Sequence, residues 1–137
     1  GGLWSLGGFP TASLQTVTRR VINMDIIRRK PIVWSGTSRE DIRAFTDQAR
    51  QRAGRELARV QEGLAPTDFK PMASVGIGVF EIRVHAEGAF RVIYAAKFAE
   101  AIYVFHAFQK KSRKTSKDDI RLARNRYRAM LKERKAR

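Results

Sequence analysis

The chain has 137 residues and no cysteine, so disulfide bonds and thiolate metal sites are excluded. This length suits one domain with a single modest core. No apolar run reaches the roughly 18 to 20 residues that a membrane-spanning helix needs, and no secretory signal pattern opens the sequence, so we expect a cytoplasmic protein. There are only two histidines, and no carboxylates stand at a suitable spacing beside them, so we expect neither a metal nor a cofactor.

The chain is strongly basic, with 28 Lys and Arg against 13 Asp and Glu and a net charge of +15 at pH 7. The charge is uneven, because the segment from Gln109 to the C-terminus carries 13 cations and three acids and so contributes +10. This density indicates a polyanionic partner, either a nucleic acid or an acidic protein. Charge alone does not separate a nucleic-acid-binding protein from a nuclease.

The first 23 residues differ from the rest, because they are rich in glycine and contain no acid. We interpret residues 1–23 as an N-terminal extension, from a tag or from upstream translation, and residues 24–137 as the domain. Met24 is then a candidate natural start. Three apolar residues at helical spacing predict a short helix over residues 13–21.

A strand is predicted at Ile32–Trp34, directly after a proline. Ser38 and Asp41 have the spacing of a capping box and predict a helix start. An apolar stripe at steps of three and four residues follows, and Thr46 can cap a second helix within it. We therefore expect two helices packed as a hairpin, the second ending at Gly63; one long helix is the alternative.

After a Pro- and Gly-rich loop, three strands are predicted at Val79–His85, Phe90–Lys97 and Ala101–Gln109. The connections between them have room only for antiparallel hairpins. The middle strand is continuously apolar, which is typical of a strand buried on both faces.

The last predicted element is a helix over Ser116–Lys135, with Ser116 as its cap and two acids in its first turn. Its expected packing residues are Ile120, Leu122, Ala123, Tyr127, Met130 and Leu131. The order of strand, two helices, three strands and helix predicts a small α+β domain in which a meander packs against helices.

These segments carry a resemblance to a known family. The segments are KPIVW, REDIRAFTDQAR, RVQEGLAPTDFKPM, GVFEIRV, FRVIYAAKF, AIYVFHAFQKKSRKTSK and DDIRLARNRY, which together cover roughly residues 30–131. The chain resembles the phage-derived branch of the RelE/HigB-type toxins of type II toxin–antitoxin systems. The combination of EIR, FRVIY and FQKK followed by KT makes the resemblance specific.

The resemblance implies a microbial-RNase-like fold with an N-terminal strand, a helical hairpin, a three-stranded antiparallel meander and a C-terminal helix. It implies a metal-independent endoribonuclease, an mRNA interferase that inhibits translation by cutting mRNA in the ribosomal A site. The implied partners are mRNA, ribosomal RNA and a cognate antitoxin with a helix-turn-helix domain. Ser116 stands where related toxins often have proline, and a serine can still cap the helix.

Cleavage of this type requires an activated ribose 2′-hydroxyl, stabilised phosphorane charge and a protonated 5′-oxygen. Arg91 matches the family's central-strand arginine and is the candidate for binding the scissile phosphate. Its alternative role is a structural ion pair with Glu81 or Glu100. Arg83 also fits a phosphate contact, although an exposed strand charge is nearly as good an interpretation.

Lys110 and Lys111 match the basic pair that follows the aromatic strand in related toxins. One of them could offset transition-state charge or protonate the leaving oxygen, and clustering with other cations would lower its pKa for that purpose. His106 is a candidate base, and its alternative is a satisfied core histidine. On a regular strand, His106 and Lys110 share a face with Ile102 and Val104.

The expected RNA-binding residues are one aromatic ring and a set of cations. Phe108 can stack on a base or pack in the core. The cations are Arg113, Lys114, Lys117, Arg121, Arg124 and Arg128. Two other functions are open, a ParE-like inhibitor of DNA gyrase on the same scaffold and a non-catalytic nucleic-acid-binding protein.

Overall fold

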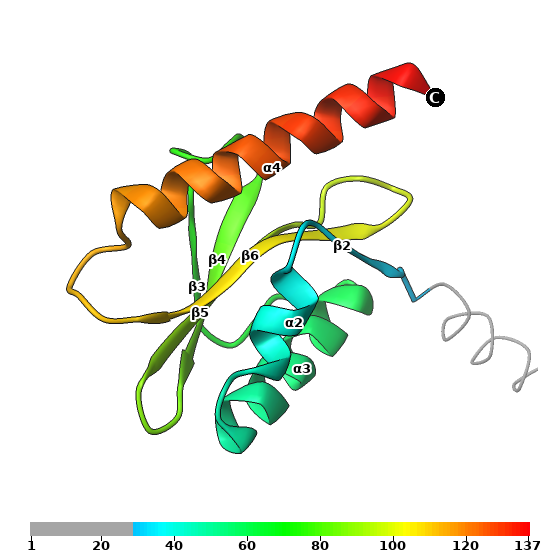
Figure 1. Cartoon of the computed structure of the whole chain (residues 1–137). Coiled ribbons are helices and arrows are strands. Elements are labelled where there is room, and N and C mark those ends of the chain that lie inside the picture. Colours follow the sequence, from blue (N-terminus) through cyan, green and yellow to red (C-terminus); the bar gives the residue numbers. More distant parts are fainter. Residues whose placement is uncertain (1–28) are drawn as a thin grey trace, which may run out of the picture.

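The chain runs from a short edge strand into two helices, continues through four strands and ends in a long helix (Figure 1). The computed structural model describes residues 29–137, so the helix expected at 13–21 and the boundary expected after residue 23 lie outside the described residues. The elements are β2 (Ile32–Trp34), α2 (Ser38–Arg43), α3 (Asp47–Gln61), β3 (Phe69–Pro71), β4 (Val79–His85), β5 (Ala89–Ala95), β6 (Ile102–Lys110) and α4 (Lys117–Ala136).

The strands form one sheet in the order β2-β6-β5-β4-β3. β4, β5 and β6 form the expected antiparallel meander, and β5 is buried along almost its whole length, as predicted. The sheet has more strands than the three of the predicted meander, because β2 joins β6 in parallel and β3 pairs with β4. β3 lies in the segment that we expected to be a loop. It has three residues and ends in a proline, so it carries no strand pattern of its own.

The sheet separates two hydrophobic clusters. Helices α2 and α3 cover one face, where their apolar stripe packs on β4, β5 and β6. Helix α4 covers the other face with Ala123, Tyr127 and Met130. Leu122 is 37% exposed, so its predicted packing role is wrong. A residue one position before Ala123 is rotated about 100° around the helix and points away from the sheet.

The predicted pair of helices is confirmed, with Thr46 accepting a hydrogen bond from the Ala49 N–H at 3.3 Å. Gly63 follows the second helix with a φ of +86°, a conformation that glycine adopts without strain. The predicted capping box is wrong, because Thr37 is the N-cap of α2. Ser38 is fully buried, and its hydroxyl donates to the backbone oxygen of Val104 at 3.1 Å.

A β-bulge interrupts β6 and decides which way its side chains point. Tyr94 of β5 pairs with Val104, but the preceding Ile93 pairs with His106, so Phe105 is an extra residue. Phe105 packs against Tyr127 of α4 with ring centroids 5.5 Å apart.

We expected His106 and Lys110 to share a face of the strand with Ile102 and Val104, and the bulge makes that prediction wrong. Ile102 and Val104 lie on the side of α2 and α3, whereas His106, Phe108 and Lys110 follow the bulge onto the α4 side. The C-terminal helix begins as predicted, because Ser116 caps it by accepting the Asp119 N–H at 3.1 Å. Among residues 29–137, no helix is both long and apolar enough to cross a bilayer.

Candidate functional site

A buried ion pair joins β4 and β5. Glu81 on β4 is completely buried, and Arg91 on β5 is 6% exposed. The Arg91 Nε lies 3.6 Å from the Glu81 Oε1, and the Arg91 Nη1 donates to the backbone oxygen of Phe90 at 2.9 Å. Burial lowers the pKa of Arg91, and the charge of Glu81 opposes that shift. Arg91 therefore forms the structural ion pair that was its alternative role, and its partner is Glu81.

Two further groups reach the Glu81 carboxylate. The Lys70 Nζ, on β3, lies 3.8 Å from Oε1, and the Thr115 hydroxyl donates to Oε2 at 2.8 Å. Glu81 Oε1 and Arg91 Nε are buried yet form no hydrogen bond within residues 29–137, so the ion pair is longer than a hydrogen-bonded one.

Neither Glu81 nor Lys70 was among the sequence-predicted site residues. Glu81 occupies the polar face of an alternating strand, which predicts exposure, but in the fold Lys70 and Arg91 of the sheet and Thr115 of the loop before α4 contact its carboxylate. Lys70 was missed because β3 was not predicted.

Three site candidates lie side by side across the sheet. Arg83 pairs with Arg91, which in turn pairs with Phe108. Arg83 is partly neutralised by Asp68, at 3.8 Å. Phe108 is partly buried against the α4-side cluster, in keeping with its core-packing alternative.

Lys110 lies further along the same face of β6, where β6 ends. Burial lowers the pKa of Lys110, and the charges of Arg91, Lys70 and Arg83 contribute to the shift, while Glu81 opposes it. The structure thus gathers Lys70, Arg83, Arg91 and Lys110 around Glu81. We call these five residues the cation cluster. Its cations outnumber the nearby acids, which suits an anionic ligand.

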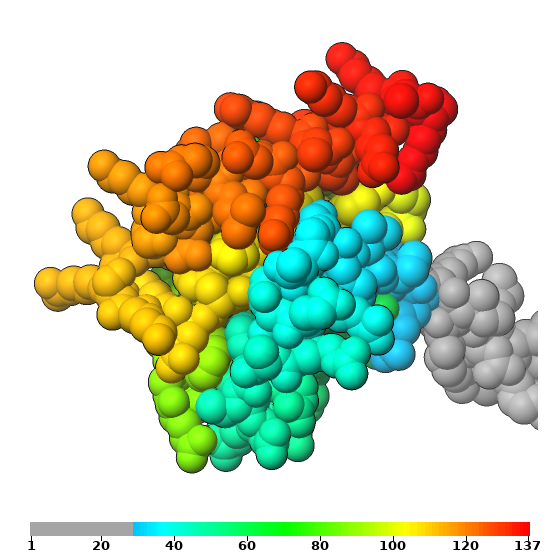
Figure 2. All heavy atoms as spheres, viewed as in Figure 1, coloured from blue at the N-terminus to red at the C-terminus, as the bar shows by residue number. Residues whose placement is uncertain are grey.

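Next to the cluster, the loop between β6 and α4 and the first residue of α4 carry exposed cations. They are Lys111, Arg113 and Lys114 of the loop and Lys117 of α4. In Figure 2 this part of the chain, in orange, projects from the left side of the molecule. Within residues 29–137, none of the four forms a salt bridge. They are therefore available to a polyanion.

His106 is held between Asp119 of α4 and Phe108 of its own strand. Its side chain is 8% exposed, its Nε2 lies 2.7 Å from Asp119 Oδ1, and its ring stacks on Phe108 with centroids 4.9 Å apart. The buried Nδ1 has no hydrogen-bond partner among the described residues. The role of His106 as a base stays a prediction, and it would have to use Nδ1.

The cations of α4 are not all free to bind RNA. Arg121 pairs with Asp118 at 3.0 Å, and the Arg124 Nε donates to the backbone oxygen of Ser74 at 2.9 Å. Arg128 is exposed and forms no salt bridge within residues 29–137. Of the three predicted docking arginines on α4, Arg128 is thus the least constrained.

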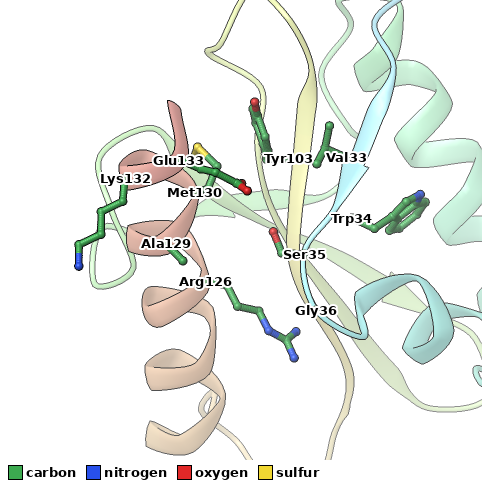
Figure 3. Close-up of a pocket in the computed structure, with 10 residues that line it drawn as sticks. All are labelled: Val33, Trp34, Ser35, Gly36, Tyr103, Arg126, Ala129, Met130, Lys132 and Glu133. Atoms are coloured by element: carbon green, nitrogen blue, oxygen red, sulfur yellow. The ribbon is translucent and has the colours of Figure 1, made fainter. Parts of the chain in front are cut away.

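Arg126 of the same helix is a structural residue. Its Nη1 donates to the backbone oxygen of Phe105 at 2.8 Å, and its side chain points toward Gly36, where a Cβ would lie 2.5 Å from the guanidinium carbon (Figure 3). It borders a cavity of about 590 Å³ between α4 and β2. The cavity is lined by Val33, Trp34, Ser35, Gly36, Tyr103, Arg126, Ala129, Met130, Lys132 and Glu133. It shares no residue with the cation cluster.

Among residues 29–137, no three His, Cys, Asp or Glu side chains are grouped so that they could hold a metal ion. The groups gathered at the cluster are ammonium, guanidinium, hydroxyl and carboxylate. Such a set can bind a phosphate, stabilise negative charge and transfer a proton.

Comparison with known proteins identifies a family. A family described as "Phage derived protein Gp49-like (DUF891)" matches residues 40–128, a span that includes the whole cation cluster. No curated protein gives a significant match. The Gp49-like family belongs to the RelE/ParE-like toxin superfamily and is associated with toxins of toxin–antitoxin systems, which implies a cognate antitoxin partner. With most of its length matched, the chain belongs to the Gp49-like family of phage-derived proteins.

Proposed function

We propose that this protein is the toxin of a toxin–antitoxin pair and cuts mRNA in the ribosomal A site, as its resemblance to RelE/HigB-type toxins implies. The observation that carries the proposal is the cation cluster, which lies beside an exposed basic loop on the α4-side face of the sheet. An inhibitor of gyrase needs no such group of cations around a reacting phosphate.

The cluster supplies parts for transesterification. The ribose 2′-oxygen attacks the adjacent phosphorus, the bond from phosphorus to the 5′-oxygen breaks, and a 2′,3′-cyclic phosphate and a 5′-hydroxyl result. DNA lacks the internal nucleophile, so the substrate is RNA. Arg91 and Lys70 stabilise the phosphorane oxygens.

Two residues are proposed for proton transfer. Lys110 protonates the leaving 5′-oxygen, and its lowered pKa favours release of that proton. His106 is the proposed base for the 2′-hydroxyl proton, with Asp119 orienting the ring through Nε2, and because Nδ1 is buried this role requires that RNA binding open its surroundings. Lys111 is the second candidate for meeting transition-state charge.

The test is primer extension on a reporter mRNA in a reconstituted translation system, with and without ribosomes. We expect cuts only when the message is translated. A gyrase supercoiling assay runs in parallel. Loss of supercoiling without RNA cuts would replace the proposal with the ParE-like alternative. If the protein shows neither activity, the remaining interpretation is a non-catalytic nucleic-acid-binding protein.

Variants separate catalysis from docking. Lys110→Ala and Lys111→Ala should slow single-turnover cleavage far more than they weaken ribosome association, because transition-state charge must be met locally. Arg128→Ala should weaken association and reduce its salt slope by about one, while the rate at saturation is unchanged. If both lysine variants cut at the normal rate once bound, the basic pair only docks the protein.

A further inference from the structure

The loop over residues 111–116, which we call the basic loop, is tied to the sheet at one point. It begins after Lys110 and ends at Ser116, the cap of α4. Inside it, the Ser112 hydroxyl donates to the backbone oxygen of Lys114 at 2.8 Å. Within residues 29–137, the only side-chain hydrogen bond from the basic loop to the sheet is the one from Thr115 to Glu81.

The acceptor of that bond is the centre of the cation cluster. Glu81 is completely buried, and its other oxygen lies within 4 Å of both Arg91 and Lys70. A hydrogen bond to a charged acceptor is shorter and stronger than one between neutral groups, and it gains strength where water is excluded. Thr115 therefore fixes the basic loop directly to the carboxylate that also holds Arg91.

We propose that Thr115 is a positioning residue, whose bond to Glu81 holds the cations of the basic loop at a set distance from Arg91. The inference rests on the proposed function and names a residue for which neither the family match nor the resemblance supplies a role. Thr115 acts through the loop and not on the RNA. Losing its bond should therefore lower the rate of bound RNA cleavage more than the affinity, because correct placement of charge matters most in the transition state.

The experiment compares Thr115→Val, which keeps the shape and removes the hydroxyl, with Thr115→Ser, which keeps the hydroxyl. We expect Thr115→Val to slow single-turnover cleavage about tenfold or more, the range for losing a hydrogen bond to a charged group, with ribosome affinity changed less than about threefold. Thr115→Ser should restore most of the rate. Ser112→Ala, which removes a bond inside the loop only, is the matched control and should cut normally.

A second readout does not depend on RNA. Trypsin cleaves after Lys and Arg, and the basic loop contains Lys111, Arg113 and Lys114. Under native conditions Thr115→Val should be nicked in this loop several-fold faster than the wild type, while Thr115→Ser and Ser112→Ala should not. Rates are normalised to the folded fraction from circular dichroism, and Thr115→Ala replaces the valine variant if the latter does not fold.

The outcomes separate this inference from the proposed function. If wild-type protein cuts no RNA, the proposed function fails, and the trypsin comparison alone decides whether Thr115 tethers the loop. Normal cleavage by folded Thr115→Val overturns the positioning role. Equal slowing by Thr115→Ser also overturns it, because the methyl group and not the hydrogen bond would then be responsible.

Discussion

Replacing Arg91 by alanine should destabilise the protein strongly, because it leaves the buried Glu81 carboxylate without its nearest counter-charge. If Arg91 only bound the scissile phosphate, the Arg91→Ala variant would instead stay folded and lose its toxicity. At 3.6 Å and an effective dielectric constant of about 20, the Arg91–Glu81 attraction is about 4 to 5 kcal/mol. Removing one partner of a buried pair typically costs about 3 to 5 kcal/mol. Lys70 still lies 3.8 Å from the carboxylate and offsets part of the loss, so we expect a cost in the lower half of that range. The compensation is only partial, because Lys70 is 38% exposed and its attraction to Glu81 is screened by water.

The assay is urea unfolding followed by circular dichroism at pH 7, on a double-mutant cycle of Arg91→Ala and Glu81→Gln. Each single variant leaves one buried charge unpaired, whereas the double variant removes both. The double variant should therefore be more stable than the sum of the single effects predicts, by at least about 1 kcal/mol. Arg83→Ala is the control, because its pair with Asp68 is partly exposed and should be worth less than about 1 kcal/mol.

Additive effects, with a coupling below about 0.5 kcal/mol, would refute the reasoning. An Arg91→Ala variant as stable as the wild type would also refute it, because Arg91 would then not stabilise the fold and its only proposed role would be to bind phosphate. The stability measurement also bears on toxicity. If Arg91→Ala is largely unfolded, its loss of toxicity says nothing about phosphate binding, and Arg91→Lys becomes the informative variant.

Two smaller predictions follow from the ends of α4. Hydrogen bonds from Arg134 and Tyr103 lower the pKa of Glu100 from 4.5 to about 2, so Glu100 stabilises the fold above about pH 4.5 and loses that contribution as the pH falls toward 2. In the Glu100→Gln variant the unfolding free energy should therefore decline less steeply across that pH window. If it declines as steeply as in the wild type, the prediction is wrong. Ser116→Ala should lower the unfolding free energy by about 1 kcal/mol, because the helix cap is lost. Urea unfolding measures the change, and the control Ser112→Ala should alter the unfolding free energy by less than about 0.5 kcal/mol.

Much of the fold could be predicted from local patterns. The alternation of β4, the apolar run of β5 and the cap at Ser116 depend on neighbours within a few residues, and each element forms where those patterns indicate. The excess of positive charge after residue 109 is likewise a property of composition. The family resemblance added Arg91 and the basic pair as candidates, and their roles remain predictions.

The arrangement of the site depended on contacts between distant segments. One extra residue in β6 turns His106, Phe108 and Lys110 onto the α4 side, and hydrophobic periodicity does not reveal it because β6 is buried on both faces around the bulge. The alternation of β4 predicts that Glu81 is exposed, whereas in the fold it is buried and accepts a hydrogen bond from Thr115, 34 residues away in the sequence. Local sequence sets which residues can form a strand or a helix, whereas the burial and pairing of a charge depend on which segments meet in space, and that is decided only when the whole chain folds.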